Sequence, residues 1–185
     1  MDTTQSNSKR NKDSFFQQFK RFLQMRDPEK HDEFVWRQLK KLMDKFNFNY
    51  MANDKIRSMQ ISFGDEKLNM RCLYYVENGH LTLRGRIADD IPEERMADVM
   101  ILVSHFNNVI GRNRLYINVE RRELELMLRL PCLEVIWNPD FMGEACSWHN
   151  QMHEKCQLAT EYMIESGEDP VFVFGYVMNK DHEKN

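Results

Sequence analysis

The sequence predicts an α+β fold in which helices pack on one antiparallel sheet, with elements in the order α-β-β-β-α-β-β-α. Two observations lead to this prediction. Apolar residues recur with a period of about 3.6 in some stretches and about 2 in the stretches between them, which indicates helices and half-buried strands. The dipeptide Asn78-Gly79 lies between two alternating runs, and Asn-Gly favours a β-hairpin because both central residues of the turn need positive φ.

The chain of 185 residues is long enough for one domain with a hydrophobic core. We expect a disordered tail over residues 1–13, which hold nothing apolar to bury beyond Met1. An amphipathic N-terminal helix over residues 14–27 should follow, then a single α+β domain over residues 28–178 and a C-terminal tail over residues 179–185. These boundaries follow the places where apolar periodicity begins and ends.

A basic, phenylalanine-rich helix is predicted before the domain. Its residues Phe15, Phe19 and Phe22 recur at helical spacing. Residues 1–26 carry six basic and two acidic side chains, a net charge of +4, so the rest of the chain is −7. Such a helix can dock in a groove, lie on a membrane or pack on its own domain. We favour the domain or a partner over a membrane, and treat Phe15, Phe19 and Phe22 as candidate partner-binding residues.

A helix over about residues 29–48 and a three-stranded meander are predicted next. In the meander, apolar residues alternate over residues 59–63 and 68–76, which are joined by the turn sequence GDEK. Centring the following turn on Asn78-Gly79 sets the pairing of the last two strands and places every apolar partner on one face. The pairs are Val76 with Leu81, Tyr74 with Leu83, and Cys72 with Gly85.

The same pairing predicts a second, outer face of the sheet that is cationic and partly apolar. Its opposed pairs are Tyr75 with Thr82, Leu73 with Arg84, and Arg71 with Arg86. Such a face is either simply solvated or a binding surface for a peptide, a partner subunit or nucleic acid. The RNP1 pattern of RNA-binding sheets is absent and the predicted domain is net acidic, so we expect no nucleic-acid role. The candidate partner-binding residues here are Leu73, Tyr75, Arg84 and Arg86.

A helix over about residues 93–110 is predicted after the meander. Pro92 suits the first turn, and the acidic residues Glu93 and Glu94 lie near the positive end of the helix dipole. Apolar residues cover more than one face of this helix, which indicates that both the sheet and a second surface cover it. The extra apolar residues, which we expect at a homodimer interface because exposed apolar patches mark interfaces, are Ile101, Leu102 and Val109.

A second hairpin is predicted over residues 115–130, where leucine, isoleucine and valine alternate with other residues. A turn at Arg121-Arg122 would join its strands. Two arginines suit a type I′ turn poorly, so a longer loop is the alternative. With the two-residue turn, the predicted pairs are Val119 with Leu124 and Ile117 with Leu126.

The C-terminal part of the chain is predicted as a connector, a long helix and a terminal strand. Residues 131–141 form the connector, which can include one short strand. A helix over about residues 140–166 follows and ends near Gly167, a residue type that suits the position after a helix. The final apolar run, VFVFGYVM, is predicted as a strand or an extended arm.

The motif CSWHNQMHEKC at residues 146–156 has the residue types of a metal site but not the spacing. On a helix that rises 1.5 Å per residue, Cys146 and Cys156 lie about 15 Å apart along the axis, whereas a zinc–sulfur bond is about 2.3 Å long. The pair His149 and His153 alone is well spaced for one ion. We interpret the motif as an amphipathic helix face, and metal or small-ligand binding through His149 and His153 stays as the alternative.

Motifs of the common enzyme classes are absent from the sequence. The glycines form neither G-x-G-x-x-G nor a P-loop, and no G-x-S-x-G appears, so we expect no catalytic residues and no cofactor. No apolar run approaches the roughly 20 residues that span a bilayer, and the polar N-terminus has no secretory h-region. Four cysteines at this length are more simply reduced thiols than a disulfide framework, which favours a cytoplasmic protein.

The order of elements and two stretches of sequence carry a resemblance to a known family. The stretches are IPEERMADVMILVSHFNN, a helix that begins at a proline and ends in asparagines, and RLYINV…ELELMLRL, the second hairpin. Over about residues 56–165 the chain resembles the YbjN-like family of bacterial proteins. That family is similar in fold to type III secretion chaperones, which are homodimers that hold extended client segments. The resemblance implies a chaperone-like fold and an interaction or regulatory role, with no active-site residues to carry over.

We therefore expect a non-enzymatic, chaperone- or regulator-like protein that forms a homodimer and binds a polypeptide partner. The partner should contact the outer sheet face and apolar helix surfaces, including the phenylalanine-rich helix. The alternative is a protein that binds a metal or a small ligand through His149 and His153.

Overall fold

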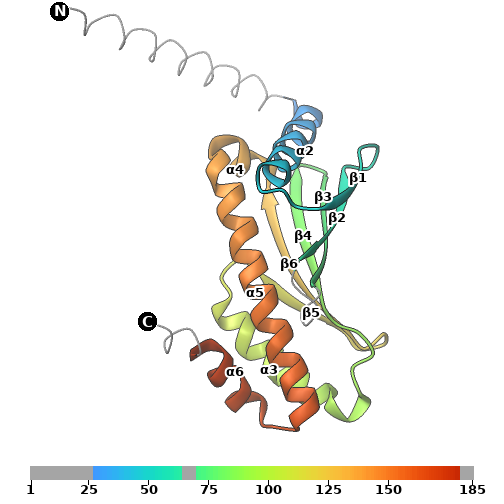
Figure 1. The fold of residues 1–185 in the computed structure, drawn as a ribbon, viewed down its shortest axis with the longest axis vertical. Helices are drawn as coiled ribbons and strands as arrows, with labels where there is room; N and C mark the ends of the chain where they lie inside the picture. Colours follow the sequence, from blue (N-terminus) through green and yellow to red (C-terminus); the bar gives the residue numbers. More distant parts are fainter. Residues whose placement is uncertain (1–26, 64–69, 180–185) are drawn as a thin grey trace, which may run out of the picture.

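The computed structural model describes residues 27–63 and 70–179. Expectations for residues 1–26, for the turn GDEK and for residues 180–185 lie outside this part of the chain. The described residues form one six-stranded sheet, and the helices gather on one of its faces (Figure 1). The α+β class predicted from the sequence is confirmed.

The elements follow the predicted order, with three additions. In chain order they are α2 (Pro28–Lys45), β1 (Tyr50–Asn53), β2 (Ser58–Phe63), β3 (Met70–Glu77), β4 (His80–Ala88), the 3-10 helix η1 (Glu93–Arg95), α3 (Met96–Val109), β5 (Arg114–Asn118), β6 (Glu123–Pro131), α4 (Cys132–Trp137), α5 (Pro139–Ser166) and α6 (Pro170–Asn179). The additions are β1, α4 and α6. The helix α4 replaces the short strand that was an option for the connector.

The sheet is antiparallel throughout, with strand order β1-β2-β3-β4-β6-β5. The hairpin of β3 and β4 turns at Asn78 and Gly79, whose φ angles of 50° and 74° are both positive, as the Asn-Gly signal requires. Its predicted register is confirmed at every pair, including Tyr74 with Leu83 and Cys72 with Gly85. Local turn chemistry is therefore sufficient to set this pairing.

The predicted register of the second hairpin is wrong by two residues. Ile117 pairs with Leu124, and Leu115 pairs with Leu126, because the strands are joined by the longer loop over residues 119–122. Side chains alternate with a period of two, so a shift by two residues leaves every side chain on the same face. Apolar alternation by itself cannot tell the two registers apart.

The C-terminal run VFVFGYVM is also mispredicted, since it forms the helix α6 rather than a strand or an arm. The Asp169 side chain begins the helix by accepting hydrogen bonds from the backbone N–H groups of Val171 (2.9 Å) and Phe172 (3.0 Å). Val173 and Val177, four residues apart, are then buried on the same helix face. Short apolar runs fit both strand and helix, and packing against α3 and α5 favours the helix here.

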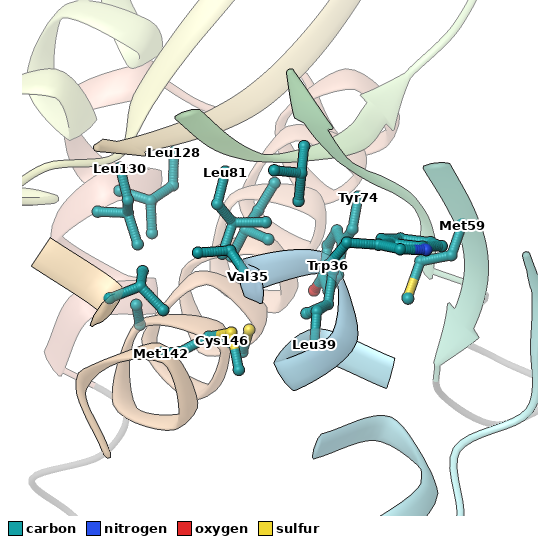
Figure 2. Close-up of a cluster of buried hydrophobic side chains, with 14 of the residues drawn as sticks. Val35, Trp36, Leu39, Met59, Tyr74, Leu81, Leu128, Leu130, Met142 and Cys146 are labelled. Atoms are coloured by element: carbon teal, nitrogen blue, oxygen red, sulfur yellow. The ribbon is translucent and has the colours of Figure 1, made fainter. Parts of the chain in front are cut away.

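The helices build two hydrophobic clusters along the inner face of the sheet. The first cluster joins α2, α4 and the beginning of α5 to the sheet, and Figure 2 shows Val35 and Leu39 of α2 close to Tyr74 and Leu81. The second cluster joins α3, α6 and the later part of α5 to the sheet. The helix α5 belongs to both clusters, and its 28 residues span about 42 Å at 1.5 Å per residue. The predicted long helix and its end at Gly167, with φ of 74°, are confirmed.

The helix α5 approaches the sheet closely where His153 packs on Gly85 of β4. A Cβ atom added to Gly85 would lie 2.8 Å from Cδ2 of His153 and 2.9 Å from its Nε2. The imidazole cannot easily move away, because Nε2 lies 2.8 Å from the Arg86 carbonyl oxygen. A glycine is therefore required for the helix to reach this distance.

We expect Gly85→Ala to lower the free energy of unfolding by about 1–3 kcal/mol, the usual cost of overpacking a core. The matched control is Gly175→Ala in α6, where an added Cβ meets no atom within 4 Å. Because alanine is a better helix former, the control should raise stability by about 0.5–1 kcal/mol. Urea denaturation followed by circular dichroism measures the free energy of unfolding of both variants. Equal effects of the two substitutions would contradict the close packing of His153 on Gly85.

Candidate functional site

The outer face of the sheet is the surface most open to a partner. The described helices pack on the opposite face, where the buried apolar residues of β3, β4 and β6 lie. On the outer face, Leu73, Tyr75 and Arg84 are half-buried, and Arg71 and Arg86 are exposed. Apolar and cationic groups therefore remain accessible over several strands of a rigid sheet.

This face is hollowed. The hollow has a volume of about 610 Å³ and extends from β1 across the sheet to β6. We call it the outer-face hollow; the lining residues that matter here are Met51, Gln60, Arg71, Leu73, Arg84 and Arg86, with Glu125 at the β6 side. A concave surface with mixed apolar and polar lining is the usual form of a binding site.

The arginines of the outer-face hollow differ in their partners. Arg84 donates to Glu125 through Nε, 2.8 Å from Oε2, and the Nη2–Oε2 distance is 2.6 Å. Arg86 donates through Nη1 to Asp89 Oδ2 at 3.2 Å, an ion pair with both side chains about half exposed. No described residue forms a hydrogen bond or an ion pair with Arg71. Arg71 and Arg86 are directly opposite each other in the ladder.

The predicted partner-binding residues are partly brought together by the fold. Leu73, Arg84 and Arg86 line the outer-face hollow; Tyr75 lies on the same face beyond its lining. Phe15, Phe19 and Phe22 lie outside the described residues, so their role stays a prediction. The contribution of β1 to the hollow was not predicted from the sequence. The strand Tyr50–Asn53 has only four residues and is mostly exposed, so it has no alternating apolar pattern.

The side chain of Glu125 is 15% exposed and pairs with Arg84. The residue lies on β6, directly opposite Arg86 and diagonal to Arg84. Alternation placed Glu125 on the outer face correctly. Its partner depends on β6 pairing with β4, which is a long-range contact that no local pattern reveals.

The three residues predicted for a dimer interface differ in their exposure to solvent. Ile101 is 44% exposed and Val109 is 47% exposed, but Leu102 is 1% exposed and belongs to the chain's own core. Leu102 is therefore not accessible to a second chain. Ile101 and Val109 remain on the open side of α3.

His149 and His153 are both fully buried, between α5 and the sheet. His153 Nε2 lies 2.8 Å from the Arg86 carbonyl oxygen, so Nε2 carries the proton and Nδ1 faces the Cys72 thiol, with 4.0 Å between Nδ1 and Sγ. His149 Nδ1 lies 2.7 Å from Oδ1 of Asn113. The two rings are parallel with centroids 6.4 Å apart. Each imidazole is thus held by groups of the protein itself.

Burial keeps these groups uncharged. Desolvation lowers the pKa of His149 to about 3, with a smaller contribution from His153, and desolvation also lowers the pKa of His153. Desolvation raises the pKa values of Cys72 and Cys146 to about 12. No three His, Cys, Asp or Glu side chains of the described residues are arranged to hold a metal ion. The geometry gives the metal-binding alternative no support and favours a buried polar cluster.

Comparisons with known proteins locate the fold. No family model matches the chain, and no curated protein matches its sequence. Among solved structures, YbjN from E. coli, a candidate transcription regulator, is similar with a TM-score of 0.53 and 9% sequence identity, over 69% of this chain and 92% of that one. The chain has a YbjN-like, chaperone-like fold.

Two complexes also resemble the YbjN-like fold of this chain. The ExsC–ExsE complex is similar with a TM-score of 0.50 and 13% identity, over 68% of this chain and 92% of the matched chain. The HopA1–SchA chaperone–effector complex is similar with a TM-score of 0.42 and 12% identity, over 66% of this chain and 95% of the matched chain. The YbjN-like fold implied by the sequence resemblance is confirmed. None of the described helices has the length and apolarity needed to cross a membrane.

The buried histidines make stability depend on pH. Above the unfolded pKa of 6.5, His149 is neutral in both states, so its contribution is fully present. Below that value the unfolded chain binds a proton that the folded chain cannot bind until about pH 3. At pH 5.5 the loss from His149 alone is about 1.4 kcal/mol, and His153 acts in the same direction. Urea denaturation at pH 7.5 and 5.5 measures this loss.

The matched control for the pH dependence is His80→Gln. His80 lies at the hairpin turn and is not buried, so this variant should keep the same loss of stability between the two pH values. A wild-type chain equally stable at pH 7.5 and 5.5 would show that the two imidazoles are not buried in neutral form.

Proposed function

We propose that this protein is a non-enzymatic, chaperone- or regulator-like protein that binds a segment of a partner polypeptide on its outer sheet face. The observation that carries the proposal is the one-sided architecture: the helices cover the inner face, and the outer face has a hollow of about 610 Å³. A sheet face that no described helix covers, and that both apolar and charged side chains line, is suited to a polypeptide.

The composition of the outer face supports a polypeptide partner. Leu73 and Tyr75 offer apolar surface, and Arg84 and Arg86 offer donors in a fixed geometry. Tyrosine and arginine are enriched among the residues that dominate binding energy at protein interfaces. The half-buried state of Tyr75 also means that its side chain loses little freedom when a partner covers it.

Two further observations support the proposal. A solved structure with this fold is a complex, ExsC–ExsE, and another is a candidate transcription regulator, YbjN.

The cytoplasm is the compartment we propose, because all four cysteines are free and buried and reduced thiols persist in a reducing environment.

The test is an affinity purification from the native host followed by quantitative mass spectrometry. The double variant Tyr75→Ala/Arg84→Ala should lose at least about nine-tenths of a specific partner, because truncation of a central interface residue typically costs about 1–2 kcal/mol or more. The matched control is Tyr162→Ala, a partly exposed tyrosine on α5 away from the outer face, which should retain the partner. Partners unchanged in the double variant would refute the surface.

We also propose that the protein is a homodimer through the open side of α3. Ile101 and Val109 are large apolar residues nearly half exposed, and Met100 beside them is 43% exposed. The same end of the molecule carries exposed Phe172 and Tyr176 on α6, which packs on α3. Neighbouring exposed apolar residues of this kind mark interfaces.

In sedimentation velocity at micromolar concentration, we expect the wild-type chain at twice its mass of 22.3 kDa. Ile101→Asp/Val109→Asp should sediment as a monomer, because burying two carboxylates in an apolar interface costs several kcal/mol. The control Ile56→Asp changes an apolar residue that is 65% exposed near β1 and should stay dimeric. A strictly monomeric wild-type chain would remove this proposal.

A further inference from the structure

We propose that the outer-face hollow recognises an acidic, extended segment of the partner, whose carboxylates pair with Arg71 and Arg86. This inference rests on the proposed function, and adds the chemistry of the segment that binds.

Arg71 and Arg86 face each other across β3 and β4 on the same face of the sheet. Like charges directly opposite in an antiparallel pair destabilise the sheet. Arg86 has Asp89 as a partner, but no described residue pairs with Arg71. Among the described residues, the opposed arginines therefore repel each other, and a bound anion would relieve this repulsion.

The hollow carries an excess of positive charge. Among the described residues, three arginines line it, and the single acidic lining residue, Glu125, is already paired with Arg84. A carboxylate can accept two parallel hydrogen bonds from one guanidinium. Arg71 and Arg86 both have exposed side chains, so their donors are available to such a group.

The positive charge of the hollow also distinguishes between three possible occupants: the chain's own N-terminal segment, nucleic acid and an acidic peptide. The chain's own segment of residues 1–26 has a net charge of +4, so it would be repelled. Nucleic acid is disfavoured because the rest of the chain has a net charge of −7, and nucleic-acid binding relies on broad positive surfaces. A short acidic peptide needs only a local positive site, and the hollow provides one. An acidic peptide is therefore the occupant that fits this charge distribution.

The dimensions of the hollow give the length of the segment. Lining residues run from Met51 on β1 to Glu125 on β6, across five neighbouring strands. Four spacings of about 4.8 Å amount to about 19 Å, the length of about six extended residues. Met51, which is 72% exposed, lies on β1 at one end of the hollow, and Leu73 lies on β3 beside the arginines. A segment that combines acidic and apolar side chains matches this lining.

The experiment measures the binding of labelled peptides to the full chain by fluorescence anisotropy at low salt. The probes are the peptides (Glu-Val)4, (Gln-Val)4 and (Lys-Val)4, and an oligothymidylate of similar length. The acidic peptide should bind at least about tenfold more tightly than the other three, and its affinity should fall with added salt. Arg71→Gln and Arg86→Gln should each weaken its binding about tenfold or more.

The matched control is Arg129→Gln. Arg129 is an exposed arginine of β6 on the same sheet face but outside the hollow, and its loss should change affinity less than about twofold. A second readout needs no ligand: Arg71→Gln should leave the melting temperature of the free protein unchanged or raise it, because the substitution removes a repulsion. A lowered melting temperature would indicate a structural role and overturn the inference.

The remaining outcomes separate this inference from the proposed function. Equal binding of the glutamine and glutamate peptides would overturn the acidic specificity while polypeptide binding stands. Tighter binding of the oligothymidylate, or no binding of the acidic peptide, would also overturn the inference. In either case the affinity purification with Tyr75→Ala/Arg84→Ala decides the proposed function independently.

Discussion

The alternation of buried and open side chains along the central strands is the constraint on which the rest of the structure depends. On β3, Cys72, Tyr74 and Val76 are buried, while Leu73 and Tyr75 between them are only half-buried. The inner face is apolar enough to hold five helices in two clusters. Because these helices all gather there, the outer face keeps its mixed apolar and cationic side chains accessible.

The helix α5 makes this one-sided arrangement a single rigid unit. It contributes to both clusters and approaches the sheet closely where His153 packs on Gly85. Burying two histidines there is tolerable because each stays neutral and bonds to a carbonyl or an amide oxygen. The same burial explains why a cysteine- and histidine-rich motif contributes to packing here, with no support for a metal site.

Among the described residues, the outer face combines a regular antiparallel sheet with two directly opposed like charges. Arg71 and Arg86 are held opposite each other by the ladder of β3 and β4, so neither can turn its backbone away from the other. Proteins commonly accept local destabilisation at binding sites when a partner relieves it. The likeness to YbjN locates the fold, and the specific chemistry of this chain lies in the side chains of its own hollow.

Sequence alone determined the elements whose cause is local. Asn78-Gly79 set the register of one hairpin, apolar periodicity predicted α2, α3 and α5, and alternation assigned Leu73 and Arg84 to the outer face. Tertiary structure decided the register of β5 and β6, the helical state of α6, the β1 wall of the hollow and the Arg84–Glu125 pair. Each of these depends on contacts between residues far apart in the chain, which a pattern of neighbouring residues does not encode.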